Sequence, residues 1–149
     1  MPSSLLLTVA RSQVLASRAA LESQLRGLDD SQAGETKSSA GDKFETSREM
    51  MQQQRDQLSA QLNVVLEQAL LLEVCERKEE SNVIGLGSVI TLDSGERYLI
   101  ACGIGRLKTD GSKAFAISLE SPIGQALKGL TANDTASFRG KELKVASVE

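Results

Sequence analysis

Apolar residues recur at intervals of seven on both sides of a short polar segment, and no other feature constrains the fold as strongly. In residues 4–28 the repeating positions are Leu7, Val14, Leu21 and Leu28. In residues 41–78 they are Phe44, Met51, Leu58, Val65 and Leu72. A spacing of seven places these side chains on one stripe of an α-helix, which is the pattern of a coiled coil. The sequence therefore predicts two long helices that pack against each other.

The polar segment, residues 29–43, interrupts both repeats and contains Gly34 and Gly41. A polar, glycine-containing break between two matched helices predicts the turn of an antiparallel hairpin, so we call residues 29–43 the tip. Folding the chain there pairs Leu28 with Phe44 and, two heptads further from the tip, Val14 with Leu58. At ~1.5 Å per residue the hairpin would be roughly 35–50 Å long.

Four arginines occupy the positions between the apolar repeats, where a regular coiled coil would carry leucine. We expect Arg11 and Arg18 to pack their stems and to hold their charged heads in solvent, although a basic groove for a partner is the alternative. Arg48 and Arg55 follow the tip and could meet Asp29, Asp30 or a binding partner. The four arginines are Arg11, Arg18, Arg48 and Arg55.

The remainder of the chain alternates short apolar runs with turn signals. Strands are expected at residues 88–92, 96–102 and 114–119 and in a closing hairpin over residues 135–148. Ser121-Pro122 predicts the start of one short helix, and Gly129 its end. We therefore expect an α+β fold with two domains: an antiparallel coiled-coil hairpin over residues 1–80 and a small domain with an antiparallel sheet over residues 81–149.

Composition excludes several classes of function. The chain has no histidine, so triads of the Ser-His-Asp kind and histidine metal sites are ruled out. Cys75 and Cys102 have neither metal-binding spacing nor the number needed for a disulfide framework, which favours a reduced, cytoplasmic protein. Residues 1–80 carry 9 Lys and Arg against 13 Asp and Glu, and residues 81–149 carry 8 against 7, so no basic stripe suits nucleic acid. We also expect no signal peptide, no membrane span and a monomer.

Residues 117–129, Ile-Ser-Leu-Glu-Ser-Pro-Ile-Gly-Gln-Ala-Leu-Lys-Gly, followed by Asn133-Asp134, resemble the C-terminal domain of the Gre transcription elongation factors. That family carries an Ile-Ser-x-x-Ser-Pro run and then a Gly-Asp turn. The resemblance implies an FKBP-like domain that docks on bacterial RNA polymerase, with the hairpin entering the secondary channel. The hairpin is too long for the related regulator of nucleoside diphosphate kinase. Residues 35–46 also resemble a subgroup of small GreA/GreB-like proteins of Bacteroidetes.

The tip departs from the pattern of those Gre factors that stimulate cleavage of backtracked RNA. In them, two tip acids help to hold a second Mg²⁺, which requires anionic oxygen ligands. Here Lys37 and Ala40 stand at those positions, and Lys43 stands where a third acid is expected. Glu35 and Asp42 remain as candidate metal ligands in a differently shaped loop.

These observations favour a non-enzymatic protein that binds RNA polymerase, modulates transcription elongation and touches nucleic acid only indirectly. It would need no cofactor, unless it shares Mg²⁺ with the polymerase. The candidate contact residues at the tip are Glu35, Lys37, Ser38, Ser39, Asp42, Lys43 and Glu45.

Three alternatives differ in what the chain would do. One is a true cleavage-stimulating factor with relocated acids at Glu35, Asp42 and Glu45. Another is a coiled-coil scaffold that associates through residues 70–72. A prolyl isomerase, suggested by an FKBP-like fold, is disfavoured because such sites are lined by aromatic side chains and this domain has only three.

Overall fold

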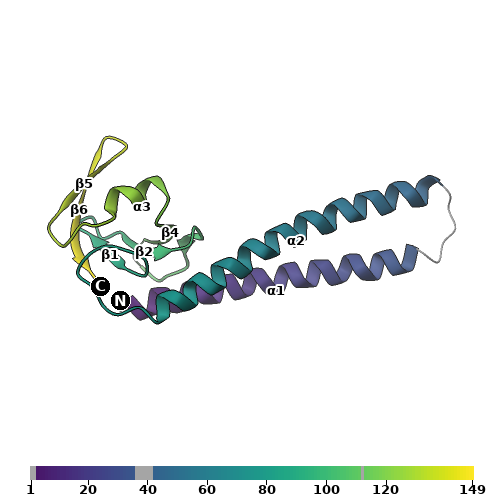
Figure 1. Ribbon diagram of the computed structural model, residues 1–149, viewed down its shortest axis with the longest axis horizontal. Coiled ribbons are helices and arrows are strands. Elements are labelled where there is room, and N and C mark those ends of the chain that lie inside the picture. Colours follow the sequence, from purple (N-terminus) through teal and green to yellow (C-terminus); the bar gives the residue numbers. More distant parts are fainter. Residues whose placement is uncertain (1–2, 36–41, 112) are drawn as a thin grey trace. The chain divides into compact units, whose positions relative to one another are not determined.

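The computed structural model describes residues 3–35, 42–111 and 113–149 of the 149-residue chain. Two long helices come first, followed by six strands and one short helix (Figure 1). The chain divides into two compact units: a hairpin unit, residues 15–67, and a sheet unit, which joins residues 1–14 to residues 68–149. The predicted fold class, a helical hairpin followed by a small α+β domain with one short helix, is confirmed.

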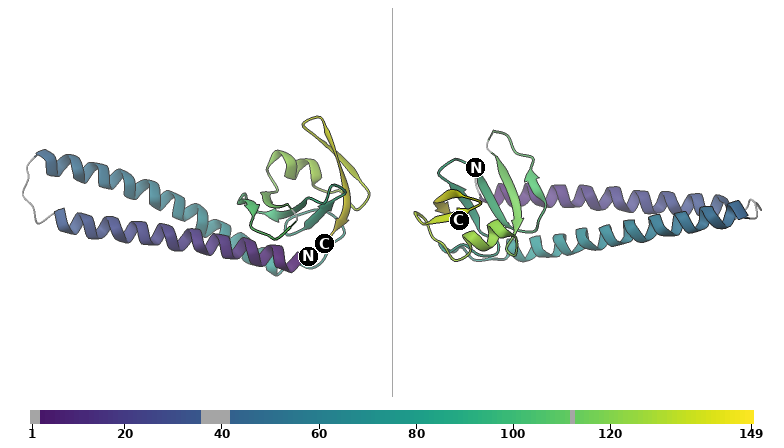
Figure 2. Two further views of the ribbon diagram at one scale, coloured as in Figure 1. Left: turned by 180° about the vertical axis from the view of Figure 1, so that it is seen from behind. Right: turned by 90° about the horizontal axis from the view of Figure 1, so that it is seen from above.

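In the hairpin unit, α1 (Ser3–Glu35) and α2 (Asp42–Glu76) run antiparallel and side by side (Figures 1 and 2). Helix α1 is longer than predicted, because it continues through Asp29 and Asp30 to Glu35. The apolar repeat ends at Leu28, but the next residues are polar or small and most of them tolerate helical dihedral angles. Loss of the apolar stripe therefore does not mark the end of the helix.

The predicted register of the hairpin, which pairs Leu28 with Phe44, does not agree with the contacts between the helices. Asp29, next to Leu28, forms an ion pair with Arg55, which lies 11 residues beyond Phe44. Leu28 and Leu58 line the same groove. A shift by whole heptads keeps the same stripes facing inward, so the spacing of apolar residues cannot distinguish these registers.

Helix α2 contains a long apolar segment, and residues 57–72 carry only one charged side chain, Glu67. By length and composition, the part Glu45–Glu76 could cross a membrane, contrary to the expectation that no stretch approaches a span. The core helices of soluble proteins meet the same criterion, so this is weak evidence for a membrane.

The sheet unit contains one six-stranded sheet in the order β3-β4-β2-β1-β6-β5. Its strands are β1 (Val89–Leu92), β2 (Arg97–Ala101), β3 (Gly105–Leu107), β4 (Ala114–Ser118), β5 (Thr135–Phe138) and β6 (Lys141–Val148). Most neighbours are antiparallel, but β2 and β4 are parallel, with Arg97 opposite Ala114. The expected antiparallel sheet is therefore a mixed sheet. The short strand β3, which the sequence did not predict, runs antiparallel to β4. It reverses the direction of the chain between β2 and β4, and this reversal makes those two strands parallel.

The main core of this unit lies between one face of the sheet and α3 (Pro122–Leu127). Ser121 caps the helix as predicted, since its Oγ accepts a hydrogen bond from the Gly124 N–H at 3.1 Å. A Cβ at Gly124 would lie 2.2 Å from the carbonyl oxygen of Ser118, so only glycine fits there. Buried residues of this core include Ile90, Ile100, Leu127 and Val145.

The first turns of α1 and the last turns of α2 belong to the sheet unit. Gln13 joins α1 to β3: its Nε2 donates to the Arg106 carbonyl at 3.3 Å, and its Oε1 accepts the Lys108 N–H at 2.7 Å. The compact units thus divide the chain within the helices, whereas the predicted domains divide it after residue 80. The buried helix residues of this unit are Leu6, Ala10, Val14, Leu72 and Cys75.

Candidate functional site

Four of the seven predicted contact residues of the tip fall at the ends of the two long helices. Glu35 is the last residue of α1, and Asp42 is the first residue of α2. Lys43 and Glu45 lie in the first turn of α2, and Glu45 is exposed. The side chains of Glu35, Asp42 and Lys43 lie outside the described part of the structure. Lys37, Ser38 and Ser39 lie wholly outside it.

Behind the tip, an ion pair connects the helices across the hairpin. Arg55 Nη2 donates to Asp29 Oδ1, which is one of the contacts that the sequence left open for Arg55. Both side chains are partly exposed, at 35% for Arg55 and 57% for Asp29. Solvent screening limits such a pair to less than about 1 kcal/mol.

The described residues near the tip are rich in exposed carboxylates. Asp29, Asp30, Glu45 and Glu49 are all exposed. Glu45, in the first turn of α2, complements the positive end of the helix dipole. Among residues with described side chains, no group of three Asp, Glu, Cys or His residues is placed to hold a metal ion. The prediction that Glu35 and Asp42 bind a metal stays a prediction.

A small polar cavity of about 200 Å³ lies in the sheet unit, where α2 ends. Lys78 Nζ donates to Ser88 Oγ at 2.9 Å, and the fully buried Ser88 Oγ also accepts the Gly85 N–H at 3.0 Å. Burial lowers the pKa of the Lys78 ammonium, although the nearby Cys75 thiol partly offsets this effect. The cavity is lined by Ser4, Leu7, Cys75, Glu76, Lys78, Glu79, Glu80, Gly87, Val89, Leu99 and Glu149.

The two cysteines of this unit are free and buried. Burial raises the pKa of the Cys102 thiol to about 11 and raises the pKa of Cys75 as well. Because the thiolate is the reactive form, both groups are poor nucleophiles near neutral pH. The cavity beside Cys75 therefore lacks an activated thiol among its described residues.

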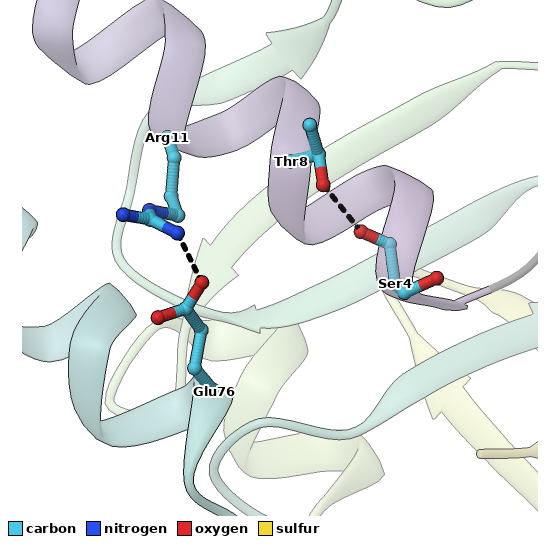
Figure 3. Close-up of polar contacts among 4 residues, drawn as sticks. All are labelled: Ser4, Thr8, Arg11 and Glu76. Carbon is cyan, nitrogen blue, oxygen red and sulfur yellow. Dashed lines mark hydrogen bonds and ion pairs between the residues drawn. The ribbon is translucent and has the colours of Figure 1, made fainter.

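An ion pair at the rim of this cavity connects the two helices. Arg11 Nη1 on α1 donates to Glu76 Oε1 on α2 (Figure 3). One turn earlier, Thr8 Oγ1 donates to the Ser4 carbonyl at 2.9 Å. Arg11 and Arg18 are both 46% exposed at the side chain, and Arg18 pairs with Glu22 on its own helix. Their charged heads thus reach solvent, as predicted.

A larger groove, which the sequence did not predict, lies on the hairpin unit. It has a volume of about 520 Å³ and lies between α1 and α2. The lining residues, which define the glutamine groove, are Gln24, Gly27, Leu28, Gln54, Gln57, Leu58 and Gln61. Two signals could have revealed it: the spacing of Gln54, Gln57 and Gln61 on one helical face, and a glycine in the middle of α1.

Comparison with protein-family models and with curated proteins gives no match. Among solved structures, GreA factor homolog 1 (Gfh1) of Thermus thermophilus is 22% identical, with 95% of each chain covered and a TM-score of 0.35. A second structure, of the transcription factor Gfh1, is 23% identical, with 94% of this chain and 93% of the other covered and a TM-score of 0.36. Thermus aquaticus Gfh1 is 19% identical, with 95% and 94% covered and a TM-score of 0.33.

Proposed function

We propose that this chain binds bacterial RNA polymerase in the cytoplasm, inserts the hairpin tip into the secondary channel and modulates transcription elongation without stimulating RNA cleavage. The observation that carries the proposal is the combination of a long hairpin with a sheet unit bearing the Gre-like motif. Helices of 33 and 35 residues form the hairpin. In the motif, Ser121 caps α3 and Pro122 is the first residue of the helix, so both residues have a structural role.

The expected lack of cleavage follows from the tip residues. Stimulating cleavage requires carboxylates that hold Mg²⁺ beside the polymerase's own metal. Lys37 and Ala40 stand where the resemblance places those carboxylates, and neither side chain is a ligand for Mg²⁺. The tip would instead occupy the channel and compete with substrate, metal or a cleavage factor.

One observation favours the alternative of a cleavage-stimulating factor. Helix α1 extends to Glu35, and α2 starts at Asp42 with Glu45 in its first turn. Three acids therefore flank the segment that joins the helices, and a suitable shape of that segment could bring their carboxylates together. This alternative predicts that each of the three is needed for RNA shortening.

A different observation favours the scaffold alternative. Leu70 and Val74 of α2 are one helical turn apart and are 63% and 55% exposed. An apolar strip of this kind is suited to packing against another chain. It predicts concentration-dependent association, which sedimentation of the purified chain would detect.

The deciding experiment uses purified RNA polymerase in stalled, backtracked elongation complexes. We expect the wild-type chain to bind, to leave the RNA length unchanged and to slow elongation or displace a cleavage factor. RNA shortening that disappears in Glu35→Ala, Asp42→Ala or Glu45→Ala would establish the cleavage alternative. Glu67→Ala, an exposed acid away from the tip, serves as the control. Absence of binding at micromolar concentration would refute the proposal.

A further inference from the structure

Lys78 follows the end of α2 and is partly buried in the sheet unit, where the loop before β1 leaves room for its side chain. A Cβ at Gly87 would lie 2.7 Å from Cδ of Lys78, and Gly87 has a φ of +86°, which favours glycine. The side chain of Lys78 therefore runs over Gly87, and its Nζ lies 2.9 Å from the Oγ of Ser88. An ordinary surface lysine holds its ammonium in solvent, so Lys78 differs from the usual case.

The hydrogen bonds of Ser88 indicate which charge state of Lys78 fits this arrangement. Ser88 is fully buried, and its Oγ accepts the Gly85 N–H at 3.0 Å. If Lys78 is an ammonium, it donates to the same Oγ, and the hydroxyl proton of Ser88 has no acceptor among the described residues. If Lys78 is a neutral amine, the hydroxyl donates to the lone pair of Nζ. The neutral amine therefore satisfies every polar atom of the Ser88 side chain.

The charges around Lys78 agree with a neutral amine. Burial lowers the pKa of Lys78, and burial also raises the pKa of the nearby Cys75 thiol, which is therefore uncharged near neutral pH. Within the described residues no carboxylate forms an ion pair with Lys78, and Glu76 pairs with Arg11 instead (Figure 3). No fixed negative charge thus holds Lys78 in the ammonium form.

A neutral lysine amine is a nucleophile, because its nitrogen has a free electron pair. Lys78 lines the polar cavity of about 200 Å³ where α2 ends. A water molecule occupies roughly 30 Å³ in the liquid, so a cavity of this size admits a molecule of only a few non-hydrogen atoms. The amine therefore adjoins a space for a small reactant.

The lining of the cavity favours an uncharged reactant. Leu7, Val89 and Leu99 supply apolar contacts. The exposed carboxylates repel anionic reactants such as acyl phosphates, but they do not repel an aldehyde or a ketone. An aldehyde or ketone converts the amine into a positively charged iminium, which nearby carboxylates stabilise. The lining glutamates without an ion pair in the described residues are Glu79, Glu80 and Glu149.

We propose that Lys78 is a reactive amine that forms a Schiff base with small, uncharged carbonyl compounds in this cavity. The side chain turns from Ser88, and the lone pair of Nζ forms a bond to the carbonyl carbon while the carbonyl oxygen takes up a proton. This oxygen then leaves as water. Amine, carbonyl compound and one proton give the iminium and one water, so the step needs no oxidant or reductant. The inference goes beyond the proposed function, because it involves neither the tip nor RNA polymerase.

The test treats the purified full chain with propanal at neutral pH in the presence of cyanoborohydride, which reduces the iminium to a stable secondary amine. Mass spectrometry of peptides then measures the labelling rate at each lysine. We expect Lys78 to react at least about threefold faster than the exposed Lys128 and Lys141, because a larger share of its amine is neutral. Ser88→Ala removes the hydroxyl donor, and it should slow labelling of Lys78 about threefold without changing the rate at Lys128. Circular dichroism confirms that the variant is folded.

The wild-type chain alone can overturn the inference, which it does if Lys78 reacts no faster than Lys128 and Lys141. Glyoxylate, a small aldehyde with a negative charge, tests the role of the carboxylates. We expect the ratio of the rates at Lys78 and Lys128 to be at least about threefold lower with glyoxylate than with propanal. An equal ratio would overturn the assignment of an uncharged reactant, and a folded Ser88→Ala with an unchanged Lys78 rate would overturn the role of Ser88. None of these results bears on polymerase binding, so the proposed function is tested separately.

Discussion

Two glycine-to-alanine substitutions should change stability in opposite directions, although the chemical change is the same. At Gly124 the new Cβ would lie 2.2 Å from the Ser118 carbonyl oxygen and 2.8 Å from that of Leu119. Both are backbone atoms, which cannot move aside as a flexible side chain could. Overpacking of this kind costs about 1–3 kcal/mol or more, which exceeds the gain of at most about 1 kcal/mol from better helix propensity. We therefore expect Gly124→Ala to lower the free energy of unfolding by about 1–3 kcal/mol.

At Gly27 the methyl group meets no atom within 4 Å, so only the gain in helix propensity remains. We expect Gly27→Ala to raise the free energy of unfolding by about 0.5–1 kcal/mol. Urea denaturation followed by far-ultraviolet circular dichroism measures both changes. Because the chain has two compact units, hydrogen exchange should assign the first change to α3 and the second to the hairpin. A neutral or stabilising Gly124→Ala would refute the reasoning from the close carbonyl oxygens.

The remaining predictions concern the titration of Tyr98, the ion pair between Asp29 and Arg55, and the packing of Leu72. Burial, with the Glu96 carboxylate as acceptor, raises the pKa of Tyr98 to about 12. Because the pKa is higher in the folded state, Tyr98 contributes its full stabilisation below pH 10 and loses it as the pH rises from 10 to about 12. The chain has one tyrosine, so the absorbance of tyrosinate should measure the titration of Tyr98 directly. A double-mutant cycle on Asp29 and Arg55 should give an interaction free energy of less than about 1 kcal/mol, and a smaller value at high salt. Leu72 is buried, so Leu72→Ala should lower the free energy of unfolding in urea by about 2–5 kcal/mol. Leu70 is 63% exposed, so Leu70→Ala should leave that free energy nearly unchanged.

Much of the fold could be read from local patterns in the sequence. The heptad repeat identified both long helices, and Ser121-Pro122 located the start of α3. Most strands were placed within a residue or two, because runs of apolar residues between turn signals are a local property. Strand β3 was missed, since three residues carry too little pattern to distinguish a strand from a loop.

The candidate site was predicted only in part. The pairing of Asp29 with Arg55 was one of several contacts considered for the arginines that follow the tip. The glutamine groove was not expected, because it forms only when particular turns of α1 and α2 face each other. That alignment depends on the register, which the repeat leaves open by whole heptads.

The sequence by itself determined which segments are helical, which stripe of each helix faces inward and which charges are available at the tip. These properties follow from residue types and their spacing along a few turns of chain. Only the tertiary structure decided the register of the hairpin, the parallel pairing of β2 with β4, and the open space beside Gly27. Each of these depends on contacts between residues that are distant in sequence. Alternative long-range arrangements, such as different registers of the hairpin, differ in free energy, and local sequence patterns do not reveal these differences.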